Sequence, residues 1–208
     1  MRKIGLILLS IILPLAIASC FALSSTSLFN EFTDAPSKVD LKDLTIWYIG
    51  NTNGMFDKVS DRMQQLGVKQ IKNLEIGKFF SNNTSESMSF DQESLVILDS
   101  YWISERVNDL EMHRFLREAS FQKAKLAAVG ELTSKFFEAL DKAGVNGLGR
   151  DENGNVRNPA YYNPPLVGFR LKQASAPDGH SYLYPSIFTS NSADIDVMIQ
   201  SLINWLGG

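Results

Sequence analysis

The sequence predicts an α/β fold, in which helices cover a mostly parallel sheet on both faces. Short apolar runs alternate along the chain with longer segments whose apolar residues recur at helical spacing. The runs are nearly continuous in apolar residues, as in strands buried on both faces of a parallel sheet. Because 44% of the 208 residues are apolar and 21% are charged, the chain can bury its own core. We expect one domain over residues 44–208.

In the first half of this domain, the sequence pattern predicts strands and one helix. Residues 44–50 form a β-branched and aromatic run that ends in glycine, which is typical of a buried strand. Residues 55–66 carry apolar side chains on one helical face and predict a helix. Residues 68–76 alternate apolar and polar side chains, which predicts a second strand. A further apolar run, 95–98, ends at Asp99.

The second half continues the alternation. We expect helices over residues 109–121, 133–144 and 195–206, and strands over 125–130, 166–171 and 181–188. Thr133 is expected to cap the second of these helices, and Pro185 marks the last strand as an edge or hairpin strand. The final helix has the clearest pattern, because its apolar residues form one stripe: Ile195, Met198, Ile199, Leu202, Ile203 and Leu206.

This order of elements resembles the flavodoxin-like fold and the class I glutamine amidotransferase fold, which implies a three-layer, doubly wound arrangement. A likeness in fold pattern does not fix a function. An amidotransferase-like enzyme would need a nucleophile at a sharp turn between a strand and a helix. The matching turn, residues 129–134, contains neither Cys nor Gly-x-Ser-x-Gly. No local pattern assembles Ser134, His180 and Asp99 as a triad.

The N-terminus has the features of an export signal. Arg2 and Lys3 precede an apolar run over residues 4–18. At about fifteen residues this run is short for a membrane span, which needs roughly twenty. A short basic start, an apolar centre and small residues after it are typical of a signal peptide.

The residues Ile17-Ala18-Ser19-Cys20 resemble the lipobox of bacterial lipoproteins, and Cys20 is the only cysteine of the chain. The resemblance implies that residues 1–19 are a signal peptide and that Cys20 is lipidated. The mature protein would then be extracytoplasmic and held at the membrane, with residues 20–43 as a tether. Simple cleavage with secretion, or an uncleaved anchor, remain the alternatives.

Charge and composition argue against several classes of protein. Twenty Lys and Arg face 23 Asp and Glu, a net charge of −3, which gives no reason to expect nucleic-acid binding. One Cys and two His argue against a metal centre, and His113 is expected to pair with Asp109 one helical turn earlier. The turn at residues 50–54 lacks the glycine patterns of nucleotide-binding loops, so no cofactor is expected.

A candidate binding site is expected where parallel strands end. The turns after residues 50, 98 and 130 should emerge at one edge of the sheet, because parallel strands place their carboxyl ends on the same side. Polar and aromatic side chains in these turns suit a small polar or cationic ligand. They are Asn51, Asn53, Asp99, Tyr101, Glu131 and Thr133. The alternative is structural: the asparagines form turns and Asp99 caps the following turn.

No complete catalytic motif is present in the sequence. The leading hypothesis is therefore a non-catalytic, membrane-tethered domain that binds a partner protein or a small polar ligand. A second hypothesis is an envelope or extracellular hydrolase that uses the carboxylates of Asp99 and Glu131. A third is a structural component of the cell envelope.

Overall fold

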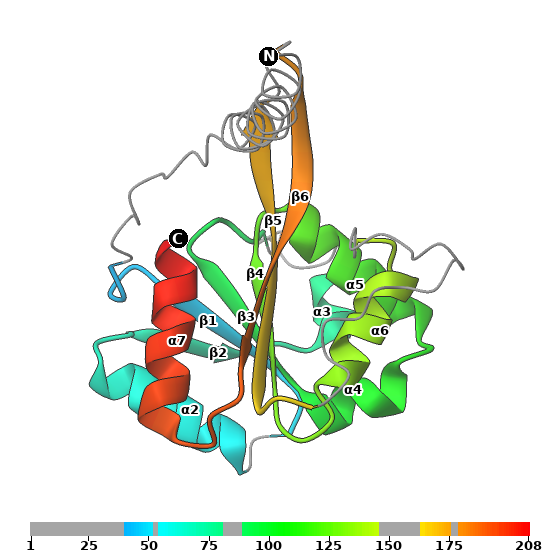
Figure 1. The fold of residues 1–208 in the computed structure, drawn as a ribbon. Helices are drawn as coiled ribbons and strands as arrows, with labels where there is room; N and C mark the ends of the chain where they lie inside the picture. Colours follow the sequence, from blue (N-terminus) through cyan, green and yellow to red (C-terminus); the bar gives the residue numbers. More distant parts are fainter. Residues whose placement is uncertain (1–39, 52–53, 81–88, 146–162, 176–178) are drawn as a thin grey trace, which may run out of the picture. The chain divides into compact units, whose positions relative to one another are not determined.

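A six-stranded sheet organises the part of the chain that the computed structural model describes (Figure 1). The described residues are 40–51, 54–80, 89–145, 163–175 and 179–208, and all belong to the compact unit Ser37–Gly208. A separate unit, Met1–Pro36, lies outside them, as do Cys20 and most of the expected tether. In chain order the strands are β1 (Thr45–Ile49), β2 (Gln70–Asn73), β3 (Ser94–Asp99), β4 (Lys125–Val129), β5 (Leu166–Ser175) and β6 (Ser181–Ser190).

The sheet is mixed but mostly parallel. Across it the strands follow the order β2-β1-β3-β4-β5-β6. The first four in this order run parallel to one another, whereas β5 is antiparallel to β4 and β6 is antiparallel to β5. The expectation of an α/β chain with a mostly parallel sheet is therefore confirmed, and a β5–β6 hairpin completes one edge.

Helices follow most of the strands and bury their apolar faces against the sheet. They are α2 (Met55–Gln65), α3 (Ile76–Phe79), α4 (Ser100–Arg106), α5 (Leu110–Phe121), α6 (Ser134–Lys142) and α7 (Ile195–Gly207). The expected helix at the end of the chain is confirmed. Four residues of its apolar stripe are buried, and Asp194 caps its start by accepting hydrogen bonds from the backbone N–H groups of Asp196 and Val197.

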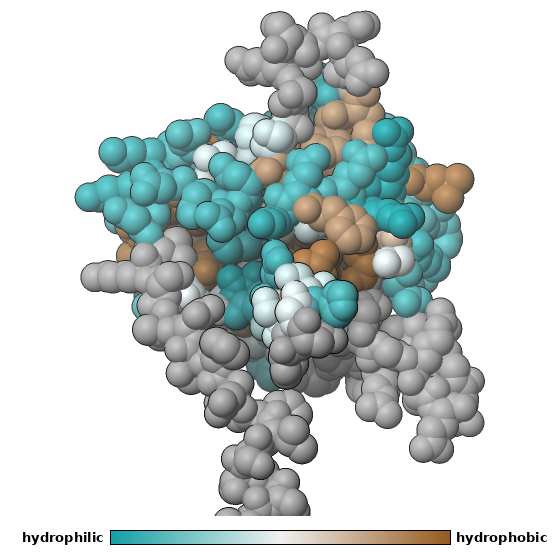
Figure 2. Space-filling model, turned by 90° about the horizontal axis from the view of Figure 1, so that it is seen from above, coloured by the Kyte–Doolittle hydropathy of each residue, from teal (hydrophilic) through white to brown (hydrophobic). Residues whose placement is uncertain are grey.

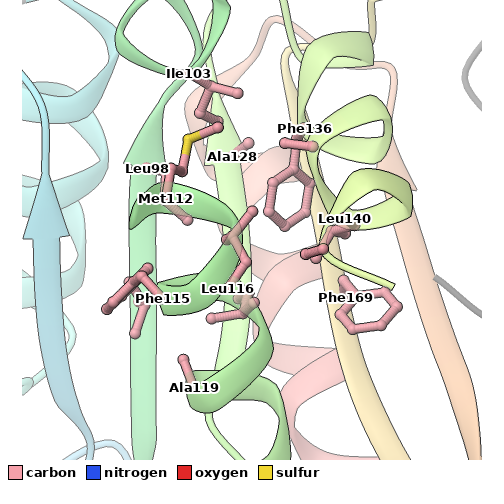
Figure 3. Packing of buried hydrophobic residues seen from close by; sticks show 14 of the residues in the cluster. Leu98, Ile103, Met112, Phe115, Leu116, Ala119, Ala128, Phe136, Leu140 and Phe169 are labelled. Carbon is pink, nitrogen blue, oxygen red and sulfur yellow. The ribbon is translucent and has the colours of Figure 1, made fainter. Parts of the chain in front are cut away.

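Two buried clusters form the core, and alternate residues of each central strand belong to different clusters. In β3, Leu95 and Ile97 pack with α2 and α7, whereas Val96 and Leu98 pack with the helices α3 to α6. Successive side chains of a strand point to opposite faces of a sheet, so both faces of β3 are buried. Figure 3 shows the second cluster, in which Met112, Phe115 and Leu116 of α5 and Phe136 and Leu140 of α6 pack near Leu98 and Ala128 of the sheet.

Several boundaries differ from the sequence expectations. The strand expected over residues 68–76 is confined to β2, because the chain turns after Asn73 and begins α3 at Ile76. β2 lies at the edge of the sheet and is mostly exposed. β5 and β6 are both ten residues long and continue past the expected strands, because they pair with each other over their whole length. No helix was expected over residues 100–106, which form α4.

Two local contacts also differ from expectation. Thr133 does not cap α6 with its side chain; its hydroxyl is buried and donates a hydrogen bond to the carbonyl of Pro164 at 2.7 Å. His113 does not pair with Asp109, because the ring Nε2 bonds the carbonyl of Val107 at 2.9 Å. The Asp109 carboxylate instead accepts from the backbone N–H of Glu111 and caps α5.

Candidate functional site at the carboxyl edge of the sheet

Three neighbouring parallel strands end at the same edge. The pairing places Ile49 of β1 opposite Leu98 of β3, and Asp99 of β3 opposite Val129 of β4. The turns after residues 50, 98 and 130 therefore emerge together, as the strand directions require.

The edge contains the topological switch point of the sheet. The chain leaves β1 toward β2 on one side and returns to β3 on the other. Ligands of open α/β sheets bind at such points, outside the carboxyl ends of the strands. The space between the ends of β1 and β3 is thus the first place to look for a site.

Two glycines let these turns approach the start of α4 closely. Gly50 and Gly130 have φ angles of 128° and 124°, a region that L side chains rarely adopt. A Cβ atom on Gly50 would lie 2.5 Å from the Cβ atom of Asp99, and one on Gly130 would meet the hydroxyl of Ser100. That hydroxyl accepts a hydrogen bond from the backbone N–H of Leu132 at 3.1 Å. The turns are therefore held against one helix terminus.

Asp99 has a structural role in this arrangement. Its Oδ1 atom accepts a hydrogen bond from the backbone N–H of Trp102 at 2.7 Å and so caps α4. The carboxylate satisfies one of the N–H groups that have no partner within the first turn of a helix.

Tyr101 and Glu131 are brought into contact. The Tyr101 hydroxyl donates a hydrogen bond to Oε2 of Glu131 at 2.8 Å, and the tyrosine is 51% exposed. The hydrogen bond to the Glu131 carboxylate and the negative charge of this group raise the pKa of the Tyr101 hydroxyl. A carboxylate and a phenol thus form an exposed polar pair at the rim of the edge.

Of the other expected site residues, those that the structure describes make separate contacts. Asn51 is exposed, and its backbone carbonyl accepts a hydrogen bond from the hydroxyl of Tyr48. Thr133 is buried beneath Pro164. Asn53 lies outside the described residues. Among the five expected residues that the structure describes, the hydrogen bond between Tyr101 and Glu131 is the side-chain contact that joins two of them.

A cavity of about 380 Å³ opens at the same edge, between the ends of β1 and β2 and the helices α4 and α5. Its lining includes Ile49, Gly50, Asn51, Leu74, Glu75, Ile76, Gly77, Trp102, Arg106, Asp109, Glu111 and Met112. We call it the Trp102 cavity. It contains one of the expected site residues, Asn51, beside the switch point.

Charged and aromatic groups line the Trp102 cavity. The guanidinium carbon of Arg106 lies 4.7 Å from the centre of the Trp102 ring, a cation–π contact. Glu75 and Glu111 bring acidic groups to the lining, and Glu75 is paired with Lys78 at 2.9 Å. A ring face, a guanidinium and carboxylates suit a small polar ligand that carries both hydrogen-bond donors and acceptors.

Sequence reasoning missed Arg106 because it missed α4. Trp102 and Arg106 are four residues apart, so they share one face of a helix. One residue of the sequence did indicate the start of α4: Asp99, a type strongly preferred as an N-cap, directly precedes this helix.

Within the described ranges, no group of three or more His, Cys, Asp or Glu side chains could hold a metal ion. Nor does any helix in this part of the chain have the length and apolar character needed to cross a membrane. Comparisons with protein-family models, with curated proteins and with solved structures found no match to this chain.

Proposed function

We propose that the chain is an exported, membrane-tethered α/β domain that binds a small polar ligand or a partner protein and does not catalyse a reaction. The lipobox-like residues Ile17–Cys20 support the tether, since Cys20 is the only thiol and lies where the motif requires it. The proposed localisation is therefore extracytoplasmic, with a lipid on Cys20 as the anchor.

The observation that supports binding best is the position of the Trp102 cavity. It lies beside the switch point between β1 and β3, where open α/β sheets bind ligands. Its volume of about 380 Å³ falls within the range of small-molecule sites, roughly 300–1,000 Å³. The three-layer, doubly wound arrangement belongs to the same proposal and is supported by the burial of both faces of β3.

The roles of the two carboxylates favour binding over hydrolysis. Asp99 is hydrogen-bonded as a helix cap, and Glu131 accepts from Tyr101. A two-carboxylate hydrolase needs one acid that donates a proton and one carboxylate that attacks or activates water. Here each carboxylate already serves a structural contact, so the hydrolase is the less favoured alternative.

The test is a thermal-shift screen with small polar compounds, including sugars, amino acids and polyamines. Arg106→Ala removes a cation from the Trp102 cavity. Arg114→Ala is the matched control, because Arg114 also stacks on an aromatic ring, Phe80, but lies outside the cavity. A ligand at 100 times its Kd stabilises by about 2.7 kcal/mol, which corresponds to roughly 5–10 °C.

The proposal expects at least one compound to raise the melting temperature of the wild type and of Arg114→Ala, but not of Arg106→Ala. Equal shifts in all three proteins would place the ligand elsewhere. No shift with any compound would remove the small-ligand proposal and favour the structural envelope component.

A further inference from the structure

The strand β5 is paired unequally on its two sides. β6 pairs with it over all ten residues, from Leu166 to Ser175, whereas β4 pairs only with Leu166–Phe169. β4 cannot continue, because α5 ends at Phe121 and the chain turns through Lys123, whose φ is 69°. In the described part of the chain, no strand pairs with residues 170–175 of β5 on the side of β4. Their backbone presents a free strand edge there.

A cavity of about 1130 Å³ lies beside this free edge. Its lining comes from β5, from the end of α5, from the start of β4 and from Ser181, Tyr182 and Leu183 of β6. We call it the β5 groove. It lies at the end of the sheet opposite the Trp102 cavity, where β5 and β6 extend beyond the other strands (Figure 1).

The side chains of Lys125 and Arg170 both line the β5 groove. The register that pairs Leu126 with Phe169, continued by one residue, brings Lys125 at the start of β4 near Arg170 of β5. Like charges at such positions repel each other. Burial lowers the pKa of both side chains; for Lys125 the charge of Glu93 opposes this effect and the charge of Arg170 adds to it. Both cations are therefore partly removed from water.

Carboxylates lie near these cations without pairing with them: the charges of Glu93 and Asp91 raise the pKa of Lys125. Among the described residues, neither Lys125 nor Arg170 forms an ion pair. Lys125 donates to the backbone carbonyl of Gln92, and Arg170 donates to that of Leu206 at 3.3 Å. The Nε atom of Arg170 is buried and has no hydrogen-bond partner there. The guanidinium carbon lies 5.0 Å from the centre of the Trp205 ring, and a guanidinium also suits a carboxylate, which its N–H groups can bind with two parallel hydrogen bonds.

The remaining lining is both charged and apolar. Lys123 and Lys172 add positive charge, and Asp40, Asp43 and Glu93 bring negative charge. Large hydrophobic side chains are exposed at the groove: Phe121 is 53% exposed, Tyr182 54% and Leu183 48%. Figure 2, which shows this end of the molecule, has hydrophobic residues among a mostly hydrophilic surface.

We propose that the β5 groove binds an extended peptide segment of a partner protein. The segment adds as a strand to the free edge of β5 at residues 170–175 and places a carboxylate against Lys125 and Arg170. Its apolar side chains contact Phe121 and Leu183. The free edge of six residues, at about 3.3 Å each, fits a peptide of roughly that length.

The outer edge of the hairpin is less suited to strand addition. β6 contains Pro185, which has no backbone N–H to donate, and prolines on edge strands disfavour pairing with another chain. The β5 edge has no proline between residues 170 and 175. Of the two edges of the hairpin, the one inside the groove is therefore the one open to a partner.

The test is selection of a phage-displayed library of random eight-residue peptides against the full chain. Selections against Arg170→Gln and Arg106→Ala run in parallel, and circular dichroism verifies that each variant folds. The best peptide is then titrated by fluorescence anisotropy, and hydrogen exchange of the backbone amides is measured with and without it.

The proposal expects peptides with an acidic residue among alternating apolar ones. Their affinity should fall about tenfold or more in Arg170→Gln, because a charge-assisted hydrogen bond is lost. Affinity should be retained in Arg170→Lys, which keeps the positive charge. It should also be retained in Arg106→Ala, because Arg106 lines the Trp102 cavity and not the β5 groove. Binding should protect amides within residues 170–175.

Three results would overturn the proposal. Peptides that bind Arg170→Gln as tightly as the wild type would exclude the cationic contact. Binding without protection of residues 170–175 would exclude strand addition. Protection that appears without peptide and rises with protein concentration, together with a dimer in sedimentation, would assign the groove to a second copy of the chain.

Discussion

Single side chains at the carboxyl edge of the sheet hold its turns in place. Asp99 caps α4, Ser100 accepts from the turn after β4, and the hydroxyl of Tyr48 bonds the carbonyl of Asn51. These three contacts satisfy polar groups that the strand ends and the start of α4 leave open. The rigidity of this edge rests on these contacts.

Replacement of Asp99 tests its role as the N-cap of α4. Asp99→Ala removes the cap of α4 and should lower the free energy of unfolding by about 1 kcal/mol, within a range of roughly 0.5–2. Asp99→Asn should lower it less, because asparagine is as good an N-cap. Urea denaturation of the three proteins measures the difference. If Asp99→Asn destabilised the fold as much as Asp99→Ala, the carboxylate charge and not the cap would be the stabilising feature.

Tyr48 should make the stability of the fold depend on alkaline pH. Burial raises the pKa of its hydroxyl above the ordinary value of about 10, and the charges of Asp99 and Asp57 raise it further. Below pH 10 both the folded and the unfolded chain hold this proton. Above pH 10 only the unfolded chain loses it, so the free energy of unfolding falls as the pH rises.

Tyr48→Phe is the variant that tests this pH dependence. It removes the titrating group and should flatten the fall in stability above pH 10, although it also loses one hydrogen bond, worth about 1 kcal/mol. Urea midpoints between pH 8 and pH 11 measure the slope for both proteins. Parallel slopes in wild type and variant would assign the alkaline unfolding to other groups.

At the scale of elements, burial decides which parts of the fold the sequence could predict. β3 and β4 are recognisable because both of their faces are buried, and β1 because its residues are nearly all β-branched or aromatic. α5, α6 and α7 are recognisable because each buries one apolar face.

The elements that could not be predicted from the sequence are short, exposed, or longer than expected because they pair with a neighbouring strand. α4 has seven residues, too few for a clear helical period, and β2 is an exposed edge strand of four. The outer residues of β5 are mostly polar, and they pair with β6. The Trp102 cavity was missed for the same reason, because two of its lining residues belong to α4. A local pattern carries no information on such distant contacts.

The docking of α7 can be tested with one core variant and one surface control. Leu202 is fully buried, so Leu202→Ala should lower the free energy of unfolding by about 2–5 kcal/mol. This corresponds to a fall in melting temperature of roughly 5–15 °C. Gln200→Ala, on the exposed side of the same helix, should change stability by less than about 0.5 kcal/mol. Equal small effects in calorimetry would show that α7 does not pack on the sheet.

At the scale of the whole molecule, one sheet presents two different surfaces. The Trp102 cavity lies where the parallel strands end, and the β5 groove lies where β4 begins and β5 continues alone. The first suits a small polar ligand and the second an extended acidic peptide. We propose that the two belong to one tethered binding domain, whose anchor at Cys20 holds both surfaces outside the membrane.

The most direct test of this account is the fate of Cys20 in a bacterium that processes lipoproteins. Wild type and Cys20→Ala are compared by membrane fractionation and by the intact mass of the mature protein. The account predicts a wild-type chain that begins at Cys20, carries added acyl mass and sediments with membranes, because dual acylation gives stable anchoring. Cys20→Ala should lack the added mass and leave the membrane fraction. A wild-type mass without lipid, or the same fractionation for both proteins, would contradict the account.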